Sequence, residues 1–474
     1  MTRHTADVLI VGAGPAGAAA ATHLARRGVD VLLLDRYAFP RDKVCGDFVG
    51  PIAMRELDGL GVGALPDYRR STAVTHASLF LDGRKLITGP FPRVAGLPPY
   101  GRVVPRLELD AWLVDGARSS GARFLAPANV GAWSAARNRV RITLSDSTEF
   151  RARLLIGADG SNSLVARQLR GGVPPPRDRL LAMRAYFRGV LGPRRRAEIY
   201  FSGESFPGYY WLFPVRGSEA NIGIGMVQDA FPPAAHLRVL LERLIDRDPA
   251  LRRRLGGAVR TSKIVGATLT TYNPSLPLTG RGVMLVGDAA GLINPLNGEG
   301  IQNALLSGRW AADAAMTALE PGGGSESLLA YVDRVERALR FDMEIARWLV
   351  RLISNRALND VWLEFLRIIT TRARSDPRYA EITGGVLAGT LPVGTVTSGP
   401  VLAGTLEQAL AAAGIKEPSQ VLEPEFAGRL ARRTARVAAV ALRQTGGDPR
   451  PLLRWAGSAV LDFAQLAERV RPRA

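Results

Sequence analysis

The N-terminal part of the chain has short continuous apolar runs joined by a helical stretch. An apolar run over residues 8–11 leads straight into a glycine-rich turn over 12–17 and an alanine-rich stretch, and a second apolar run covers 29–34. A continuous apolar strand, a helix and a second such strand within about 30 residues form a βαβ unit of a parallel sheet. The pattern predicts that the chain opens as a doubly wound nucleotide-binding domain.

The middle of the chain has shorter, turn-rich segments. Strand-like stretches separated by Gly and Pro cover 79–99 and 183–227, where 209–214 and 221–226 are the clearest. Short strands at such spacing are typical of an antiparallel sheet. Between these stretches, residues 107–117 have helical spacing.

The C-terminal part returns to helical periodicity. A buried-strand pattern at 282–286 precedes a helix predicted over 298–319. The residues after 328 are also predicted to be helical, with a Gly/Pro-rich break at 384–400 and further helix from 406 onward. An apolar stripe in this region comprises Ile345, Leu349, Leu352 and Ile353.

Composition limits the class of protein. The chain has 474 residues, 47% of them hydrophobic and 22% charged, which is typical of a folded protein of two or three domains. One cysteine, Cys45, excludes an internal disulfide, and four scattered histidines predict no metal site. Neither a leader sequence nor an apolar run of membrane-spanning length is visible. We therefore expect a cytoplasmic protein, and peripheral contact with a membrane stays open.

The charge balance is strongly basic. Lys and Arg number 62 against 43 Asp and Glu, a formal net charge of +19, and nearly all of the excess is arginine. Such a surplus can attract an anionic membrane surface, an acidic carrier protein or nucleic acid. No nucleic-acid motif accompanies it, so we predict no nucleic-acid partner, and solvated arginine-rich helix faces explain the charge equally well.

The first glycine-rich turn carries a specific chemistry. Gly12, Gly14 and Gly17 follow a predicted strand and open a helix, so backbone amides can approach a pyrophosphate at the positive end of that helix. Asp35 follows Gly17 by 18 residues, where a carboxylate accepts ribose hydroxyl protons. Because Asp35 would repel a 2′-phosphate, the site favours the adenosine of FAD or NAD over that of NADP.

Two later segments separate FAD from NAD. The segment 287–291 follows a buried strand, and Asp288 within it is suited to bind ribityl hydroxyls. A second glycine-rich turn, 297–300, opens the next helix, whose N-terminus would stabilise the negative charge of a reduced flavin. Together the segments predict FAD.

These motifs resemble a known family. The turn at 12–17 with Asp35, the Gly-Ala-Asp-Gly segment at 157–160 and Gly287-Asp288 are similar to the three fingerprints of a flavoprotein superfamily. That superfamily includes aromatic hydroxylases, geranylgeranyl reductases and flavin-dependent halogenases, and the resemblance covers roughly residues 7–320. It implies an FAD domain interleaved with a substrate domain.

Local segments resemble the geranylgeranyl reductase-like branch. These are the proline-to-cysteine segment 40–47, the aromatic segment 209–214 and the loop 294–301. A histidine-valine-glycine-glutamate-serine segment, typical of halogenases, is absent near Cys45. Aromatic hydroxylases usually have histidine where Gly291 stands and glutamine in place of Glu299, so the sequence resembles that branch less well.

The expected fold is α/β: a doubly wound FAD-binding domain interleaved with an antiparallel-sheet substrate domain, plus a helical C-terminal region. The predicted boundaries are 1–75, 100–172 and 275–325 for the FAD domain, 76–99 and 173–274 for the substrate domain, and 326–474 for the helical region.

Individual site residues follow from the motifs and the resemblance. The expected cofactor-binding residues are Gly12, Gly14, Pro15, Ala16, Gly17, Asp35, Arg36, Cys45, Arg106, Asp159, Gly287, Asp288, Gly298, Gly300 and Ile301. No catalytic acid is identifiable, and Cys45, Tyr210 and Trp211 are the catalytic candidates. Strand alternation places Tyr209, Trp211 and Phe213 on one face and Tyr210 on the other, and either face is compatible with plain core.

Three functions stay open at this point. A reductase would use FAD and NAD(P)H to saturate an alkene, and a monooxygenase would deliver one oxygen atom, in either case on a large hydrophobic isoprenoid, polyene or polyketide of specialised metabolism. The alternative is a cyclase in which FAD only supports a four-plus-two cycloaddition of a polyene. The length of chain beyond the FAD motifs keeps that alternative open.

Overall fold

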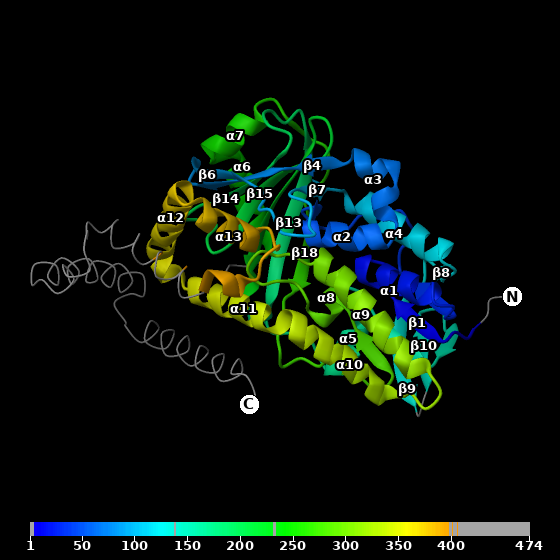
Figure 1. Ribbon diagram of the computed structural model, residues 1–474. Helices are drawn as coiled ribbons and strands as arrows, with labels where there is room; N and C mark the ends of the chain where they lie inside the picture. Colours follow the sequence, from blue (N-terminus) through cyan, green and yellow to red (C-terminus); the bar gives the residue numbers. More distant parts are fainter. Residues whose placement is uncertain (1–3, 137–138, 231–233, 398–400, 402–404, 406–474) are drawn as a thin grey trace, which may run out of the picture.

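The computed structural model describes residues 4–136, 139–230, 234–397, 401 and 405. The helical segment predicted from 406 to the C-terminus lies outside them. Figure 1 shows a helix-covered sheet that holds the N-terminus beside a larger sheet with its own helices.

The N-terminal sheet is parallel except at one edge. Its strands in spatial order are β19 (Thr279–Gly280), β20 (Val283–Leu285), β12 (Leu154–Gly157), β1 (Val8–Val11), β2 (Val31–Leu34) and β8 (Arg123–Leu125). Only β19 runs antiparallel to its neighbour. The four central strands are buried along their whole length, as continuous apolar runs predict.

Helices cover this sheet. Helix α1 (Pro15–Ala25) packs against α9 (Ile301–Leu319) and α4 (Arg106–Ser119). Helix α9 begins at Ile301, later than the predicted 298, because Gly298 has a φ of +73° that no helix accommodates. The shorter helices are α2 (Pro51–Gly59), α3 (Pro66–Arg70), α5 (Leu164–Arg170) and α8 (Gly287–Ala290).

Two further sheets have three strands each. They are β11 (Glu149–Ala152), β10 (Arg139–Leu144) and β9 (Val130–Ala136), and β3 (Phe48–Val49), β7 (Gly101–Val103) and β4 (Thr72–Val74). Short 3₁₀ turns lie at Val62–Ala64, Pro176–Asp178, Gln228–Ala230, Ser325–Leu328, Arg356–Leu358 and Val393–Thr397.

The large sheet has eight strands. Its spatial order is β17 (Val259–Arg260), β13 (Arg179–Arg188), β16 (Ala220–Val227), β15 (Tyr209–Pro214), β14 (Arg196–Phe201), β5 (His76–Leu81) and β6 (Arg84–Pro90), and β18 (Val265–Thr270) also pairs with β13. All pairs are antiparallel except that of β5 with β14, which is parallel and joins two segments far apart in the chain. The α/β fold class predicted from the sequence is confirmed.

The two faces of the large sheet have different neighbours. Helices α6 (Ala234–Arg247) and α7 (Pro249–Leu255) cover one face, where Tyr200, Tyr210 and Ile222 are buried among leucines. The other face carries Tyr209 and Trp211 and borders a cavity.

The C-terminal helices complete the wall of that cavity. They are α10 (Leu329–Val335), a π-helical turn (Glu336–Arg340), α11 (Phe341–Ile353), α12 (Asn359–Ser375) and α13 (Pro377–Leu387). Helix α12 packs against β6, and Figure 1 shows α11, α12 and α13 grouped beside the large sheet. Helix α13 extends past 384, where the sequence predicted a break.

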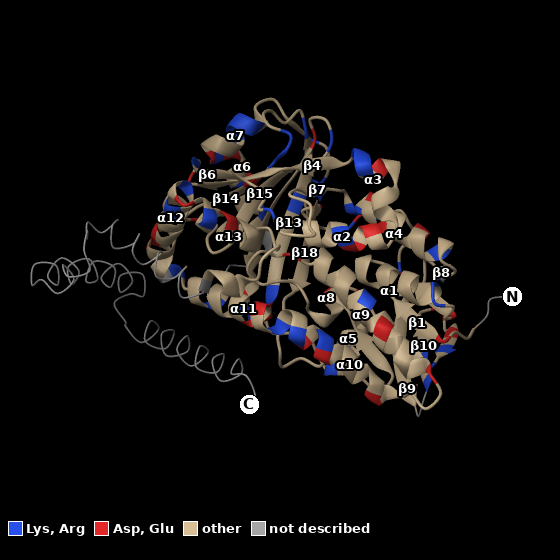
Figure 2. Ribbon diagram, viewed as in Figure 1, with Lys and Arg blue, Asp and Glu red and all other residues tan. Residues whose placement is uncertain are grey.

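Charge is distributed over many elements. In the view of Figure 2, Lys and Arg are spread over several helices and loops with acidic residues between them. Among the described residues, no helix has both the length and the apolar character needed to span a membrane.

The contact between α1 and α9 depends on Gly308. A Cβ at Gly308 would lie 2.3 Å from the carbonyl oxygen of Ala16, which is shorter than any real contact. We predict that Gly308→Ala lowers the free energy of unfolding by about 1–3 kcal/mol, because the helices must separate. Chemical denaturation measures the change.

Gly116→Ala on α4 is the matched control. Its Cβ would have its nearest neighbour, the carbonyl oxygen of Leu60, at 3.9 Å. We expect this substitution to be neutral or stabilising by about 0.5–1 kcal/mol, as for glycine in a helix interior. Equal stability of the two variants would show that the helices do not need this close approach.

Candidate active site

Two glycines of the first turn are required by the fold itself. A Cβ at Gly12 would lie 2.2 Å from the carbonyl oxygen of Ala158, and a Cβ at Gly17 would lie 1.9 Å from the carbonyl oxygen of Gly12. Gly12 also has a φ of +102°. These glycines let the turn pack against the neighbouring strand connection.

Gly14 is different because it faces open space. Among the described residues, the atoms within 4 Å of a Cβ at Gly14 are guanidinium nitrogens of Arg41, at 3.7 Å, and Arg106, at 3.9 Å. No side chain of the described residues caps the N-terminus of α1, so its first amides keep their hydrogen-bonding capacity. A space bordered by two cations and helix-start amides fits the pyrophosphate of a dinucleotide.

Asp35 lies at the end of β2 beside this space. Its carboxylate accepts hydrogen bonds from the backbone amides of Ala13 and Tyr37, both at 2.9 Å. A guanidinium nitrogen of Arg41 lies 3.7 Å from it. These contacts fix a buried carboxylate that still has lone pairs for ribose hydroxyls.

Asp110 holds the two arginines in place. Arg106 donates to both of its carboxylate oxygens, at 2.7 and 2.8 Å, and Arg41 donates at 2.8 Å. Burial alone would raise the pKa of Asp110, but Arg106 and Arg41 lower it below the ordinary value. Arg41, Arg106 and Asp110 together have a net charge of about +1, which favours an anionic ligand.

Asp288 on α8 marks the other end of the site. Lys43 donates to its carboxylate at 2.9 Å and Ser161 donates at 3.5 Å. Burial opposes ionisation, yet Lys43 and Arg106 lower the pKa of Asp288, so it is ionised at neutral pH. Such a carboxylate is suited to accept hydroxyl protons of a ribityl chain.

A cavity of about 1300 Å³ adjoins these residues. Its lining includes Pro15, Lys43, Arg106, Asp288 and the turn from 297 to 300. From there it extends along the large sheet to the C-terminal helices. The apolar lining from these helices includes Phe341, Ile345, Trp348, Leu349, Leu352, Ile353, Trp362, Phe365, Leu366 and Ile369.

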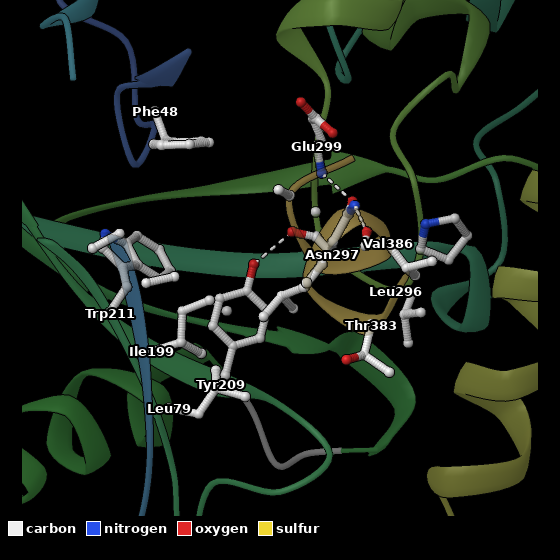
Figure 3. A pocket seen from close by; sticks show the side chains of 18 of the residues that line it. Phe48, Leu79, Ile199, Tyr209, Trp211, Leu296, Asn297, Glu299, Thr383 and Val386 are labelled. Carbon is white, nitrogen blue, oxygen red and sulfur yellow. Dashed lines mark hydrogen bonds between the residues drawn. The ribbon is translucent and has the colours of Figure 1, made fainter. Parts of the chain in front are cut away.

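The strand β15 divides its side chains between cavity and core. Figure 3 shows Tyr209 and Trp211 at the cavity, where the Tyr209 hydroxyl donates to the carbonyl oxygen of Asn297 at 2.7 Å. The Tyr210 hydroxyl instead donates to Asp248 at 2.6 Å on the opposite face. The structure therefore places Tyr210, a candidate for catalysis, away from the cavity, because successive strand residues face opposite sides.

Asp47 joins the cofactor side to the large sheet. Its carboxylate is fully buried and accepts hydrogen bonds from the Tyr186 hydroxyl at 2.6 Å, the Asn221 amide at 2.8 Å and the backbone amide of Arg106 at 3.3 Å. The indole of Trp211 donates to Asn221 at 2.9 Å. Burial raises the pKa of Asp47 to about 6, although these donors lower it.

Cys45 lies in the cavity wall beside this junction. Its carbonyl oxygen accepts a hydrogen bond from Asn221 at 2.8 Å. Burial raises the pKa of its thiol, and the nearby Arg106 opposes that shift only in part. Cys45 therefore carries a proton at neutral pH and is no nucleophilic thiolate.

Comparisons with known proteins agree with this geometry. Residues 5–186 match the model of a family described as an FAD binding domain. The chain is 38% identical over 320 residues to a menaquinone reductase of Mycobacterium tuberculosis, covering 65% of this chain and 76% of that protein. It is 33% identical over 377 residues to digeranylgeranylglycerophospholipid reductase 1 of Methanopyrus kandleri, covering 76% and 93%.

The chain belongs to the geranylgeranyl reductase-like family of FAD-dependent oxidoreductases. The fold agrees, because the crystal structure of a geranylgeranyl bacteriochlorophyll reductase-like protein from Thermoplasma acidophilum has a TM-score of 0.64. That likeness has 22% sequence identity and covers 89% of this chain and 99% of the other.

Most of the predicted cofactor residues of this flavoprotein lie together. The structure groups Gly12, Gly14, Pro15, Ala16, Gly17, Asp35, Cys45, Arg106, Gly287, Asp288, Gly298, Gly300 and Ile301 around the turn, α8 and the start of α9. Asp159 also lies beside the turn, with its Cα 2.7 Å from the position of a Cβ at Gly12, but its carboxylate accepts from the amide of Leu164 at 2.7 Å and so caps α5. Arg36 follows Asp35 but is exposed, and its guanidinium stacks over the ring of Tyr37.

Sequence reasoning missed several residues of the flavoprotein's site. Lys43 and Asp47 lie in a segment noted only for its resemblance, and Glu299 was noted only as part of a turn and as a difference from aromatic hydroxylases. Strand alternation did place Tyr209 on the same face of its strand as the candidate Trp211. No local signal indicated that Asp47 meets Asn221, because 174 positions separate them.

Gly14 provides a direct test of the FAD site. We predict that Gly14→Val weakens FAD binding at least tenfold, because its side chain enters the space beside Arg41 and Arg106. The unfolding free energy of the apo-protein should stay near that of the wild type. Calorimetric titration of apo-protein with FAD, beside chemical denaturation, measures both.

Gly17→Val is the contrasting variant, because its side chain would collide with the backbone and should destabilise the apo-protein. Wild-type FAD affinity in Gly14→Val would contradict this placement of the cofactor.

Proposed function

We propose that the protein saturates carbon–carbon double bonds in the isoprenoid chain of a lipid. The observation that carries this proposal is the large, mainly apolar cavity that begins at the cofactor residues and extends to the C-terminal helices. Its volume of about 1300 Å³ exceeds the usual range for small-ligand pockets, about 300–1,000 Å³. A long hydrocarbon chain fits such a space.

The lining suits a chain rather than a polar molecule. Each buried methylene contributes about 0.8 kcal/mol, so a long chain binds through many small apolar contacts. The aromatic side chains of Trp211, Trp348 and Trp362 offer flat surfaces to unsaturated carbons. The names of the relatives in M. tuberculosis and M. kandleri support the same substrate class.

Different residues of the chain would hold different parts of the cofactor. When bound, FAD supplies two-electron hydride chemistry, for which NAD(P)H is the expected donor. Gly14, Arg41 and Arg106 would hold its pyrophosphate, and Asp35 and Asp288 its ribose and ribityl hydroxyls. The apolar walls exclude water from the reacting carbons.

The other functions considered have less support. Neither oxygen transfer nor cycloaddition is favoured by a contact in the described residues, and the two relatives above are reductases by name. A role in specialised metabolism has no supporting observation. Peripheral contact with a membrane agrees with a lipid substrate and with the net charge of +19.

Product mass distinguishes the three functions. The FAD-loaded protein is incubated anaerobically with NAD(P)H and a geranylgeranyl glycerolipid or a menaquinone, and fragment masses locate any added hydrogen in the chain or in the quinone ring. We expect a gain of two hydrogens per saturated bond in the chain. Hydrogen added to the ring alone, oxygen added in an aerobic reaction, or turnover without a mass change would each contradict the proposal.

The part of the cavity wall that α12 forms should limit chain length. We predict that Ile369→Trp on α12 raises the KM for a long isoprenoid about 5–150-fold, because overpacking costs about 1–3 kcal/mol. A short isoprenoid should be unaffected. Steady-state kinetics with both substrates measure the effect.

Arg367→Trp, on the same helix but at a half-exposed side chain, is the matched control and should leave both KM values unchanged. An unchanged KM for the long chain in Ile369→Trp would place the chain elsewhere.

A further inference from the structure

Glu299 carries a buried carboxyl oxygen without a partner. It lies in the turn between α8 and α9, and its Oε2 atom accepts no hydrogen bond from the described residues. A Cβ at Gly50 would lie 2.7 Å from its Oε1, and a Cβ at Gly389 would lie 1.6 Å from its Oε2. Two glycine backbones therefore lie directly against the carboxyl group, and any side chain at either position would collide with it.

Within the part of the chain that the structure describes, no cation is paired with this carboxyl group. The charged residue that acts on it is Asp342 on α11, another acid. Lys43, on the cofactor side, is paired with Asp288, and the Tyr209 hydroxyl donates to Asn297 instead. Burial, with a further contribution from Asp342, raises the pKa of Glu299 to about 8. Glu299 is therefore mostly protonated at neutral pH.

Other carboxylates around the site contrast with Glu299. Asp110, Asp288 and Asp47 each accept at least two hydrogen bonds, as buried acids that serve structure or charge normally do. Burying an acid without a hydrogen-bond partner costs far more free energy in its charged form than in its neutral form. A neutral acid has a proton to give.

The position of Glu299 connects the cofactor turn with the cavity. It stands between Gly298 and Gly300, and it lines the cavity together with Phe48 and Ala388. Figure 3 shows its carboxyl group turned away from Tyr209 and Asn297, at the end of the turn. A proton on this group is therefore available to a substrate on the Phe48 side of the cavity.

We propose that Glu299 is the acid that supplies the proton when a carbon–carbon double bond is saturated. This inference rests on the proposed function. The π bond breaks, one carbon gains a hydride derived from the nicotinamide donor, and the other gains the Glu299 proton as its O–H bond breaks. The resulting carboxylate regains a proton from water, so atoms and electrons balance.

Glu299→Gln tests the inference, because glutamine keeps the shape and has no acidic proton. In the FAD-loaded protein we expect chain saturation to slow about 10²–10⁴-fold, the usual contribution of a general acid. Reduction of bound FAD by NAD(P)H should keep its rate, as measured by stopped-flow absorbance. FAD affinity near that of the wild type confirms that the variant is folded.

The wild type gives a test that needs no variant. Because the protonated form donates, saturation should be constant below about pH 8 and fall tenfold per pH unit above it. Asp342→Asn removes the neighbouring like charge, so it should lower the pKa of Glu299 and move this decline to lower pH.

Infrared spectroscopy examines the proton without catalysis. A wild-type minus Glu299→Gln difference spectrum at pH 7 should show the carbonyl band of a protonated carboxyl, which disappears on titration through about pH 8. The band should titrate at lower pH in Asp342→Asn.

Absence of this band, or wild-type saturation by Glu299→Gln, overturns the inference and leaves the proposed function standing. Failure of the wild type to saturate any isoprenoid chain instead overturns the proposed function and the inference with it.

Discussion

The buried carboxylate of Asp47 connects the cofactor region to the substrate sheet. Burying an ion costs several kcal/mol unless donors surround it, and Tyr186, Asn221 and the amide of Arg106 are those donors. Through Asn221 the junction also fixes the backbone of Cys45 and the indole of Trp211. The cavity wall beside the flavin site therefore has one defined shape.

The cavity combines two different environments. Its cofactor end holds ionised groups, such as Asp288 with Lys43, that are paired and hydrogen-bonded. Its remaining walls come from the aromatic face of β15 and from the C-terminal helices. Hydride chemistry on an apolar chain requires this arrangement, because the chain needs a dry site and the cofactor needs charged partners.

Much of the fold could be predicted from the sequence. The βαβ unit, the glycine turn and Asp35 are local patterns, since one strand, one turn and one helix determine them. The helical stripe through Ile345 and Leu349 was also visible, but not that it faces the cavity.

The long-range parts of the site could not be predicted. Asp47 meets Tyr186 and Asn221, which lie 139 and 174 positions away in the chain. Glu299 is distinctive only because Gly50, Gly389 and Asp342 converge on it. Strand alternation predicted that Tyr209 and Tyr210 of β15 face opposite sides of the sheet, but it did not predict which side faces the cavity. Tyr210 turned out to belong to the core behind the sheet, hydrogen-bonded to Asp248.

The most direct test of the central claim is the anaerobic reoxidation of the flavin. The FAD-loaded protein is reduced with one equivalent of NAD(P)H, and its visible absorbance is followed after a geranylgeranyl lipid without a quinone ring is added. A reductase of isoprenoid chains predicts that the oxidised spectrum returns with this lipid and not with its fully saturated counterpart. Return of the spectrum only on admission of oxygen would contradict the account.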